Sequence, residues 1–170
     1  MNQFDLAEEI RKNACLRLQE SLDKIIKCLA HFDDQSIWHR SNENSLSMAN
    51  QLLHLSGNIT QYIISGLGKL PDNRNRDAEF AARSGYTKNI LVDNFRKVVE
   101  DALRIIQNSS VDDLLNIKSV QGFNLSGTGI IIHVVEHLSY HTGQIVAYTK
   151  EKINQPMGFY DSVNLNFKND

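Results

Sequence analysis

Apolar residues recur at spacings of three and four along four long stretches of the chain, which is the period of an amphipathic helix. The first stretch covers residues 5–31, and its apolar face consists of Leu6, Ile10, Leu18, Leu22, Ile25, Ile26 and Leu29. The second covers residues 45–67, and its apolar face consists of Leu46, Ala49, Leu53, Ile59, Ile63 and Leu67. Ser45 can cap this second helix with its hydroxyl oxygen.

Two further helices are predicted in the second half of the chain. Thr87 can cap a helix that ends at residues 108–110. Its apolar positions are Leu91, Phe95, Val98, Val99, Leu103 and Ile106. Thr128 opens the last helix, which runs through Lys152 because Pro156 prevents further extension.

Two of the connecting segments are longer or more structured than simple turns. Residues 68–85 contain Pro71, two glycines and the polar run 72–77, so a long loop is expected there. Residues 116–125 alternate loosely in polarity and contain Gly122. This pattern indicates a short extended or hairpin excursion between the third and fourth predicted helices.

The order of these elements favours an all-α fold, a four-helix bundle with up-and-down or crossover connections. The sequence has no sustained strand pattern and no internal repeat. With 170 residues, we expect one domain over residues 1–170, large enough for a single hydrophobic core. Residues 156–170 then form a C-terminal tail that packs on the bundle or on a partner.

Composition narrows the classes of partner and the compartment. The 18 basic and 20 acidic residues give a formal charge of −2, which does not favour nucleic acid or an anionic membrane as a partner. No apolar run approaches the roughly 20 residues that span a bilayer, and residues 1–5 lack the features of a signal peptide. We therefore expect a cytoplasmic protein. Cys15 and Cys28 fall roughly 20 Å apart in one predicted helix, too far for a disulfide, and should be reduced, packed thiols.

Three of the six histidines fall in one nine-residue stretch inside the last predicted helix. They are His133, His137 and His141, and their spacing of four stacks successive side chains on one helical face. The outer two are about 12 Å apart along the helix axis, whereas metal–nitrogen bonds are only about 2.0–2.1 Å long. A metal ion could therefore be bound by His133 with His137 or by His137 with His141.

The helical wheel and the need for a further ligand favour the second pair. His141 lies nearer than His133 to the apolar arc of the last helix and so points further into the bundle. A catalytic zinc ion usually has three protein ligands. His54 is the only histidine in the middle of another predicted helix, where it belongs to a polar stripe that could line a cleft: Ser47, Asn50, Asn58 and Gln61.

The remaining histidines are expected in solvent, and a purely structural role competes with metal binding for the other ones. His31 and His39 lie near helix ends or in loops and are expected to be solvated. A lone histidine on a polar stripe is usually exposed too, and histidine pairs at this spacing also occur incidentally on helices. From the spacing alone, metal binding thus stays one of two interpretations.

Three segments resemble the DinB/YfiT-like superfamily. Residues 133–145, which read HVVEHLSYHTGQI, are similar to its signature, in which a histidine pair ends in a His-x-Gly-Gln-Ile phrase. Residues 51–58, QLLHLSGN, resemble the family's motif in the second helix, whose histidine is the third ligand. Residues 72–80, DNRNRDAEF, are similar to the loop of one uncharacterised subgroup. The resemblance extends in order over nearly the whole chain.

This resemblance implies a four-helix bundle that holds one divalent metal ion, zinc or nickel, at His54, His137 and His141. His133 matches no ligand position and is expected to pack beside the site. Some members of the superfamily transfer a low-molecular-weight thiol, such as bacillithiol or mycothiol, to electrophiles. The subgroup that this chain resembles has no established activity. A homodimer is the expected assembly.

The resemblance and the residues together suggest three functions. The first is a metal-dependent thiol S-transferase acting on small electrophiles, in which Arg74 and Arg76 bind carboxylates of the thiol cosubstrate. The competing interpretation of these arginines is a solvated loop paired with Asp77 or Glu79. The second function is a metal-dependent hydrolase, and the third is a non-catalytic, metal-binding dimeric bundle. No residue is assigned as catalytic, and Glu136 is expected on the surface.

Overall fold

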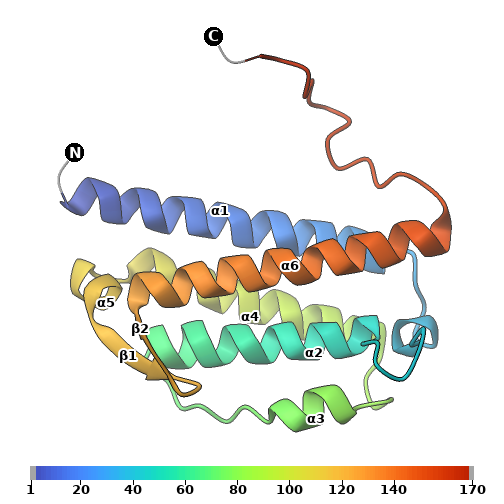
Figure 1. The fold of residues 1–170 in the computed structure, drawn as a ribbon, viewed down its shortest axis with the longest axis horizontal. Coiled ribbons are helices and arrows are strands. Elements are labelled where there is room, and N and C mark those ends of the chain that lie inside the picture. Colours follow the sequence, from blue (N-terminus) through green and yellow to red (C-terminus); the bar gives the residue numbers. More distant parts are fainter. Residues whose placement is uncertain (1–2, 169–170) are drawn as a thin grey trace.

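The computed structural model describes residues 3–168, which form the predicted all-α bundle (Figure 1). Its long helices are α1 (Gln3–Leu29), α2 (Met48–Ile59) with its continuation η2 (Thr60–Leu67), α4 (Lys88–Asn108) and α6 (Gly127–Ile153). The shorter elements are η1 (Ser36–Trp38), α3 (Arg76–Ala81), α5 (Val111–Leu115), β1 (Ile117–Val120) and β2 (Phe123–Ser126). The four predicted helices are therefore confirmed.

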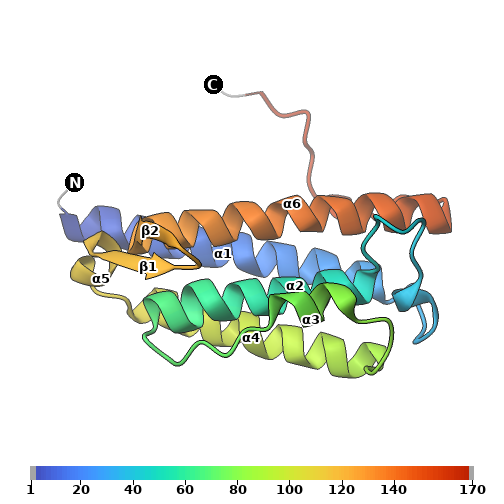
Figure 2. The same ribbon diagram turned by 60° about the horizontal axis from the view of Figure 1, so that its bottom comes forward.

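The long helices form two layers. Helices α1 and α6 lie side by side in one layer, and α2 and α4 form the other, as the two views agree (Figures 1 and 2). Helix α3 packs on the outer side of α2, and the β1–β2 hairpin lies beside the start of α6 (Figure 2). Because α2 also contacts α6, side chains on these two helices meet inside the bundle.

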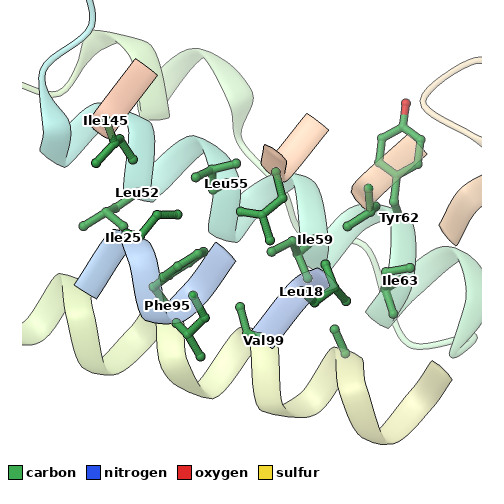
Figure 3. Close-up of a cluster of buried hydrophobic side chains, with 14 of the residues drawn as sticks. Leu18, Ile25, Leu52, Leu55, Ile59, Tyr62, Ile63, Phe95, Val99 and Ile145 are labelled. Atoms are coloured by element: carbon green, nitrogen blue, oxygen red, sulfur yellow. The ribbon is translucent and has the colours of Figure 1, made fainter. Parts of the chain in front are cut away.

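The core contains most of the predicted apolar positions of the four helices, but Leu6 is exposed, and Leu52 and Leu55 are buried in α2 where Leu53 was expected. Figure 3 shows this cluster, whose labelled members are Leu18, Ile25, Leu52, Leu55, Ile59, Tyr62, Ile63, Phe95, Val99 and Ile145. Each of these side chains is almost completely buried. Burial of one such side chain contributes about 1.5–3 kcal/mol, so the amphipathic pattern determines how the helices face one another.

Two helix starts differ from the prediction by two residues. Ser47, and not Ser45, caps α2, because its extended backbone lets its hydroxyl accept the Asn50 N–H. Ser45 instead closes a turn with its own N–H. Helix α6 is capped by Ser126, whereas Thr128 lies inside the first turn. Thr87 caps α4 as predicted.

The last two turns of the second predicted helix are wider than an α-helix. Over Thr60–Leu67 the backbone has π-helical i→i+5 hydrogen bonds, as in the 2.8 Å bond from Gly68 N–H to the Ile63 carbonyl. A β-carbon at Gly68 would lie only 2.6 Å from the Ile64 carbonyl oxygen and 2.7 Å from Ile105 of α4. Gly68 thus permits the close approach of this end of the helix to α4.

The connections contain elements that the sequence pattern predicted in part. The excursion predicted over residues 116–125 is confirmed as the hairpin β1–β2, whose strands pair antiparallel with Ile117 opposite Ser126. Helix α5 was missed, although Ser110 and Asp113 form a capping box at its start. Helix α3 was also missed, and it lies inside the segment expected to be a long loop.

The C-terminal tail leaves the end of α6, contacts α1 with its first residues and then runs away from the bundle (Figure 1). Lys24 Nζ donates to the Tyr160 hydroxyl over 2.9 Å, and Met157 is buried against the bundle. Beyond this point Val163, Leu165 and Phe167 are exposed. Among the described residues, no helix combines the length and apolarity that crossing a membrane requires.

Candidate metal centre

Three histidines meet where α2 faces α6. His54 comes from α2, and His137 and His141 come from successive turns of α6. One ligand nitrogen from each lies within 4.8 Å of the others, and His54 Nε2 is 2.9 Å from His137 Nε2. The ring centroids are 4.7–5.1 Å apart, at interplanar angles of 65–78°. The three rings therefore form a nearly equilateral cluster.

This cluster has the dimensions of a metal site. A tetrahedral ion with metal–nitrogen bonds of about 2.0–2.1 Å holds its ligand nitrogens roughly 3.3 Å apart. The observed separations, from 2.9 Å to at most 4.8 Å, bracket that value. The spacing of the three nitrogens is thus close to the spacing around a single ion.

His141 is oriented by a neutral side chain. Its Nδ1 lies 3.3 Å from the amide oxygen of Gln51, and both residues are buried. An amide oxygen only accepts hydrogen bonds, so we place the imidazole proton on Nδ1. Nε2 of His141 then keeps its lone pair for the centre of the cluster.

His54 is oriented by a charged pair. Its Nδ1 lies 3.2 Å from Glu79 Oε2 and 3.1 Å from Arg74 Nη2. The carboxylate only accepts and the guanidinium only donates, but Nη2 of Arg74 already donates to Glu79 Oε2 over 2.9 Å. We therefore place the His54 proton on Nδ1, where it donates to Glu79, which is also the tautomer that leaves Nε2 free to coordinate. His54 Nε2 then accepts from His137 Nε2 in the 2.9 Å contact. Binding of an ion in the centre would move the His137 proton to its other ring nitrogen.

His133 lies beside the cluster and outside it. Its ring stacks on Tyr62 of η2, with centroids 4.2 Å apart, and lies parallel to the ring of His137 at 5.6 Å. Its Nε2 is 3.5 Å from the amide nitrogen of Asn58. Of the two candidate pairs on α6, the structure thus brings His137 and His141 together with His54.

Burial keeps the histidines of α6 uncharged. Desolvation, together with the neighbouring imidazoles, lowers the pKa of both His137 and His141 to about 4. Burial also lowers the pKa of His133, although nearby Glu136 opposes this shift. Only a neutral imidazole can coordinate a metal ion, so this environment prepares the nitrogens for binding at neutral pH.

Glu79 stays ionised although it is buried. Burial raises its pKa, but hydrogen bonds from Arg74 and His54 outweigh that effect and hold the pKa below its ordinary value. The site therefore contains one permanent negative charge directly behind His54, compensated by the guanidinium of Arg74. Both groups come from the segment between η2 and α4.

The two predicted cosubstrate-binding arginines occupy different environments. The side chain of Arg74 is only 3 % exposed; it donates through Nε and Nη2 to Glu79 and through Nη1 to Gln61. Arg74 thus forms an interior ion pair, which is neither the solvated ion pair nor the carboxylate-binding arginine expected from the sequence. Arg76 is exposed, with its guanidinium carbon 4.5 Å from the centre of the Phe80 ring.

The structure adds site residues that sequence reasoning missed. His54 is 6 % exposed, because Phe80 and Glu79 of α3 cover it. The polar stripe on α2 is therefore an interior surface and not an open cleft. The sequence pattern suggests Glu79 only as a surface partner for arginine and assigns no role to Gln51. Gln51 could have been found from its place three residues before His54, on the same helical face.

The other ionisable candidates lie outside the cluster. His31, His39 and Glu136 are exposed. Cys28 is a buried free thiol, Cys15 is a half-buried one, and desolvation raises the pKa of both. Thiols with a raised pKa are poor nucleophiles, which agrees with their expected role as packed side chains.

A cavity of about 560 Å³ borders the charged pair that supports His54. It lies between α2, the segment before α3 and Tyr86, and its wall includes Gly57, Arg74 and Glu79. Its volume is in the range of small-molecule sites. Access to this cavity leads to Glu79 and not directly to the ligand nitrogens.

Comparison with known proteins identifies the fold. The sequence matches the family described as "Protein of unknown function (DUF1572)" over residues 5–157. The structure is similar to the crystal structure of a DinB-like protein from Bacillus cereus ATCC 10987, with 17 % identity and a TM-score of 0.63. That similarity covers 82 % of this chain and 89 % of the other. No curated protein matches the chain. The DinB-like resemblance of the sequence is thus confirmed at the level of fold.

Proposed function

The chain belongs to the DUF1572 family of proteins of unknown function, and we propose that it binds one divalent metal ion, zinc or nickel. The ligands are His54, His137 and His141. The observation that supports this proposal best is the convergence of three ring nitrogens from two helices within 4.8 Å. Two of these imidazoles are buried and His137 is half-buried, and three such polar rings in contact do not stabilise a core as apolar side chains would.

The donor set suits zinc or nickel better than a hard cation. Three imidazole nitrogens match the preferences of borderline metals, whereas magnesium and calcium prefer oxygen ligands. The three ligands are neutral, so the ion would keep its full positive charge. Three protein ligands also leave a coordination position for a small molecule, as in catalytic zinc sites.

We propose further that the protein is a thiol S-transferase. When bound, the ion would lower the pKa of a low-molecular-weight thiol and so supply a thiolate at neutral pH. In the transfer, a sulfur electron pair forms the bond to an electrophilic carbon, a leaving group departs with its bonding electrons, and the thiol proton passes to solvent. Gln51 and Glu79 contribute by fixing the orientation of His141 and His54.

The role of the arginines in this proposal is narrower than the sequence suggested. Arg74 is committed to Glu79 and Gln61, so we assign it to the support of the metal centre. Arg76 is exposed near Phe80, and the ring of Phe80 packs against that of His54 with the ring centroids 4.9 Å apart. We propose that Arg76 binds a carboxylate of the thiol cosubstrate.

One experiment tests metal binding and activity in sequence. The metal content of the purified protein is measured, and the zinc- and nickel-loaded protein is then incubated with bacillithiol and a panel of electrophiles. We expect one ion per chain and a metal-dependent loss of thiol, both abolished in His141→Ala. Metal-dependent release of acid from esters without thiol consumption would favour a hydrolase. Binding without turnover would favour a non-catalytic bundle.

A further inference from the structure

Glu79 is the charged side chain through which α3 contacts the metal centre. Its Oε1 accepts from Arg74 Nε over 2.8 Å, and its Oε2 accepts from Arg74 Nη2 over 2.9 Å. The same Oε2 lies 3.2 Å from His54 Nδ1. The side chains of Arg74, Glu79 and His54 are 3, 10 and 8 % exposed. Water therefore competes little for these hydrogen bonds.

A notch in α2 accommodates this charged pair. A β-carbon at Gly57 would clash with Glu79 Oε1 and lie 2.8 Å from its carboxyl carbon and 2.9 Å from Arg74 Nε. Gly57 is one turn after His54, so the notch and the ligand lie on the same side of the helix. Glycine weakens a helix interior, and here it makes room for a carboxylate to reach the imidazole.

The rest of the segment is attached to the bundle by contacts that do not involve the metal ligands. Asn50 donates through its amide nitrogen to the carbonyls of Glu79 and Ala82, at 2.8 and 3.0 Å. Arg40 donates to the Phe80 carbonyl at 2.9 Å. These bonds hold the backbone of α3 on α2. The Glu79 side chain is thus not required as the sole anchor of α3, and one of its oxygens is aimed at a ligand.

We infer that Glu79 is a positioning residue that couples the metal centre to the docking of residues 69–86. It holds His54 in the tautomer whose Nε2 faces the cluster, and it belongs to a segment that packs on α2 from outside the four long helices. This inference rests on the proposed metal binding. Coupling is reciprocal: docking of the segment tightens metal binding, and metal binding tightens docking.

The first arm of the test measures the dissociation constant for zinc by competition with a chromophoric chelator. Glu79→Gln should weaken zinc binding about 10- to 100-fold, the usual cost of losing the partner of a ligating histidine. The matched control is Asp77→Asn, which removes the same charge from an exposed position of the same helix. It should leave the dissociation constant within about twofold of wild type, far below the loss expected on removal of a ligand's partner.

A second variant separates positioning from simple attachment. In Arg74→Met with Glu79→Met, apolar side chains replace the buried ion pair, a change that often preserves packing. We expect this double variant to keep wild-type helicity and still to bind zinc about tenfold or more weakly. If zinc binding is unchanged in both this variant and Glu79→Gln, Glu79 only attaches the segment and the inference is overturned.

The second arm measures amide hydrogen exchange in residues 69–86 with and without zinc. Zinc should slow exchange there in the wild type and in Asp77→Asn, and should have little effect in Glu79→Gln. A segment whose exchange ignores zinc in the wild-type protein would contradict the coupling. A wild-type chain that binds no metal would instead refute the proposed function, so the two failures are distinguishable.

Discussion

His54 and His141 are two ligands of one candidate centre, but different chemistry orients them. Behind His54 stands an ionised carboxylate that is itself held by a guanidinium, on a segment outside the four long helices. Behind His141 stands the neutral amide of Gln51, one turn away from His54 on α2 itself. The group that orients His141 thus belongs to a long helix, whereas the group that orients His54 belongs to α3. We call His141 with Gln51 the fixed half of the centre, and His54 with Glu79 and Arg74 the adjustable half, because the proposed coupling acts on the latter.

The largest expected loss of metal binding follows from replacing a proposed ligand, because each half of the centre contains one. His54→Ala and His141→Ala should each reduce the metal content from one ion per chain to nearly none, since two imidazoles leave the ion mostly to water. His133→Ala should retain its metal, because that ring faces Tyr62. Elemental analysis of the variants at neutral pH is the measurement, with helicity checked by circular dichroism. Loss of metal in His133→Ala together with retention in His141→Ala would move the site to the other pair.

Gly57→Ala should disturb the adjustable half without changing any charge. The added methyl group would displace Glu79 and Arg74 from the notch. We expect zinc binding to weaken about tenfold or more, as for loss of a ligand's supporting group, although alanine favours the helix. Gly143→Ala is the control, since a β-carbon there meets open space. Equal zinc affinity in both variants would show that the notch does not matter for the centre.

Replacing Gln51 tests the fixed half. A neutral hydrogen bond contributes about 0.5–1.5 kcal/mol, so Gln51→Leu should weaken zinc binding by about 2- to 10-fold, less than Glu79→Gln. Gln51→Glu would place a carboxylate behind His141 too, and it should bind zinc more tightly than wild type. Competition with a chelator measures both. The comparison between the two halves fails if Gln51→Leu costs more affinity than Glu79→Gln.

Acid should destabilise the metal-free protein in a defined window. The pKa of His137 and His141 is lowered to about 4 in the fold, whereas an unfolded histidine has a pKa of about 6.5. Protonation therefore favours unfolding, so stability is full above pH 6.5 and falls as the pH drops toward 4. Urea unfolding between pH 7 and 4 measures this dependence. Replacing both residues by Gln should flatten it, and an unchanged slope would contradict the burial that we describe.

The smallest effect is expected for the cysteines, which belong to neither half. Changing Cys15 and Cys28 to alanine should leave the metal content at one ion per chain, because both thiols lie outside the histidine cluster. Elemental analysis and a thermal melt measure metal content and folding. A folded double variant without metal would show that the ligand set is wrong.

The sequence predicted the bundle and one side of the centre because both depend on local periodicity. The apolar faces determine the long helices, and the four-residue spacing of His137 and His141 places them on one face of α6. The choice of Ser47 over Ser45 depends on backbone angles that a serine-rich stretch does not reveal. The π-helical turns after Ile59 likewise depend on how that helix end packs against α4.

The other side of the centre could not be predicted from spacing. His54 belongs to a polar stripe, and such a stripe is solvent-exposed on most helices. Its burial results from α3, a helix of six residues inside a segment rich in loop-forming residues. The pairing of Glu79 with His54 joins residues 25 positions apart, and only the tertiary fold brings them together. Sequence reasoning therefore pointed to the candidate ligand and missed its environment.

The distance along the chain between the candidate ligands has a consequence for unfolding. His54 and His137 are 83 residues apart, so an ion bound to both would act as a removable cross-link between the N-terminal and C-terminal parts of the polypeptide. Neither part could unfold without releasing the ion. At a free metal concentration 100 times the dissociation constant, this linkage adds about 2.7 kcal/mol to the free energy of unfolding. The melting temperature would then report the free zinc or nickel concentration around the protein.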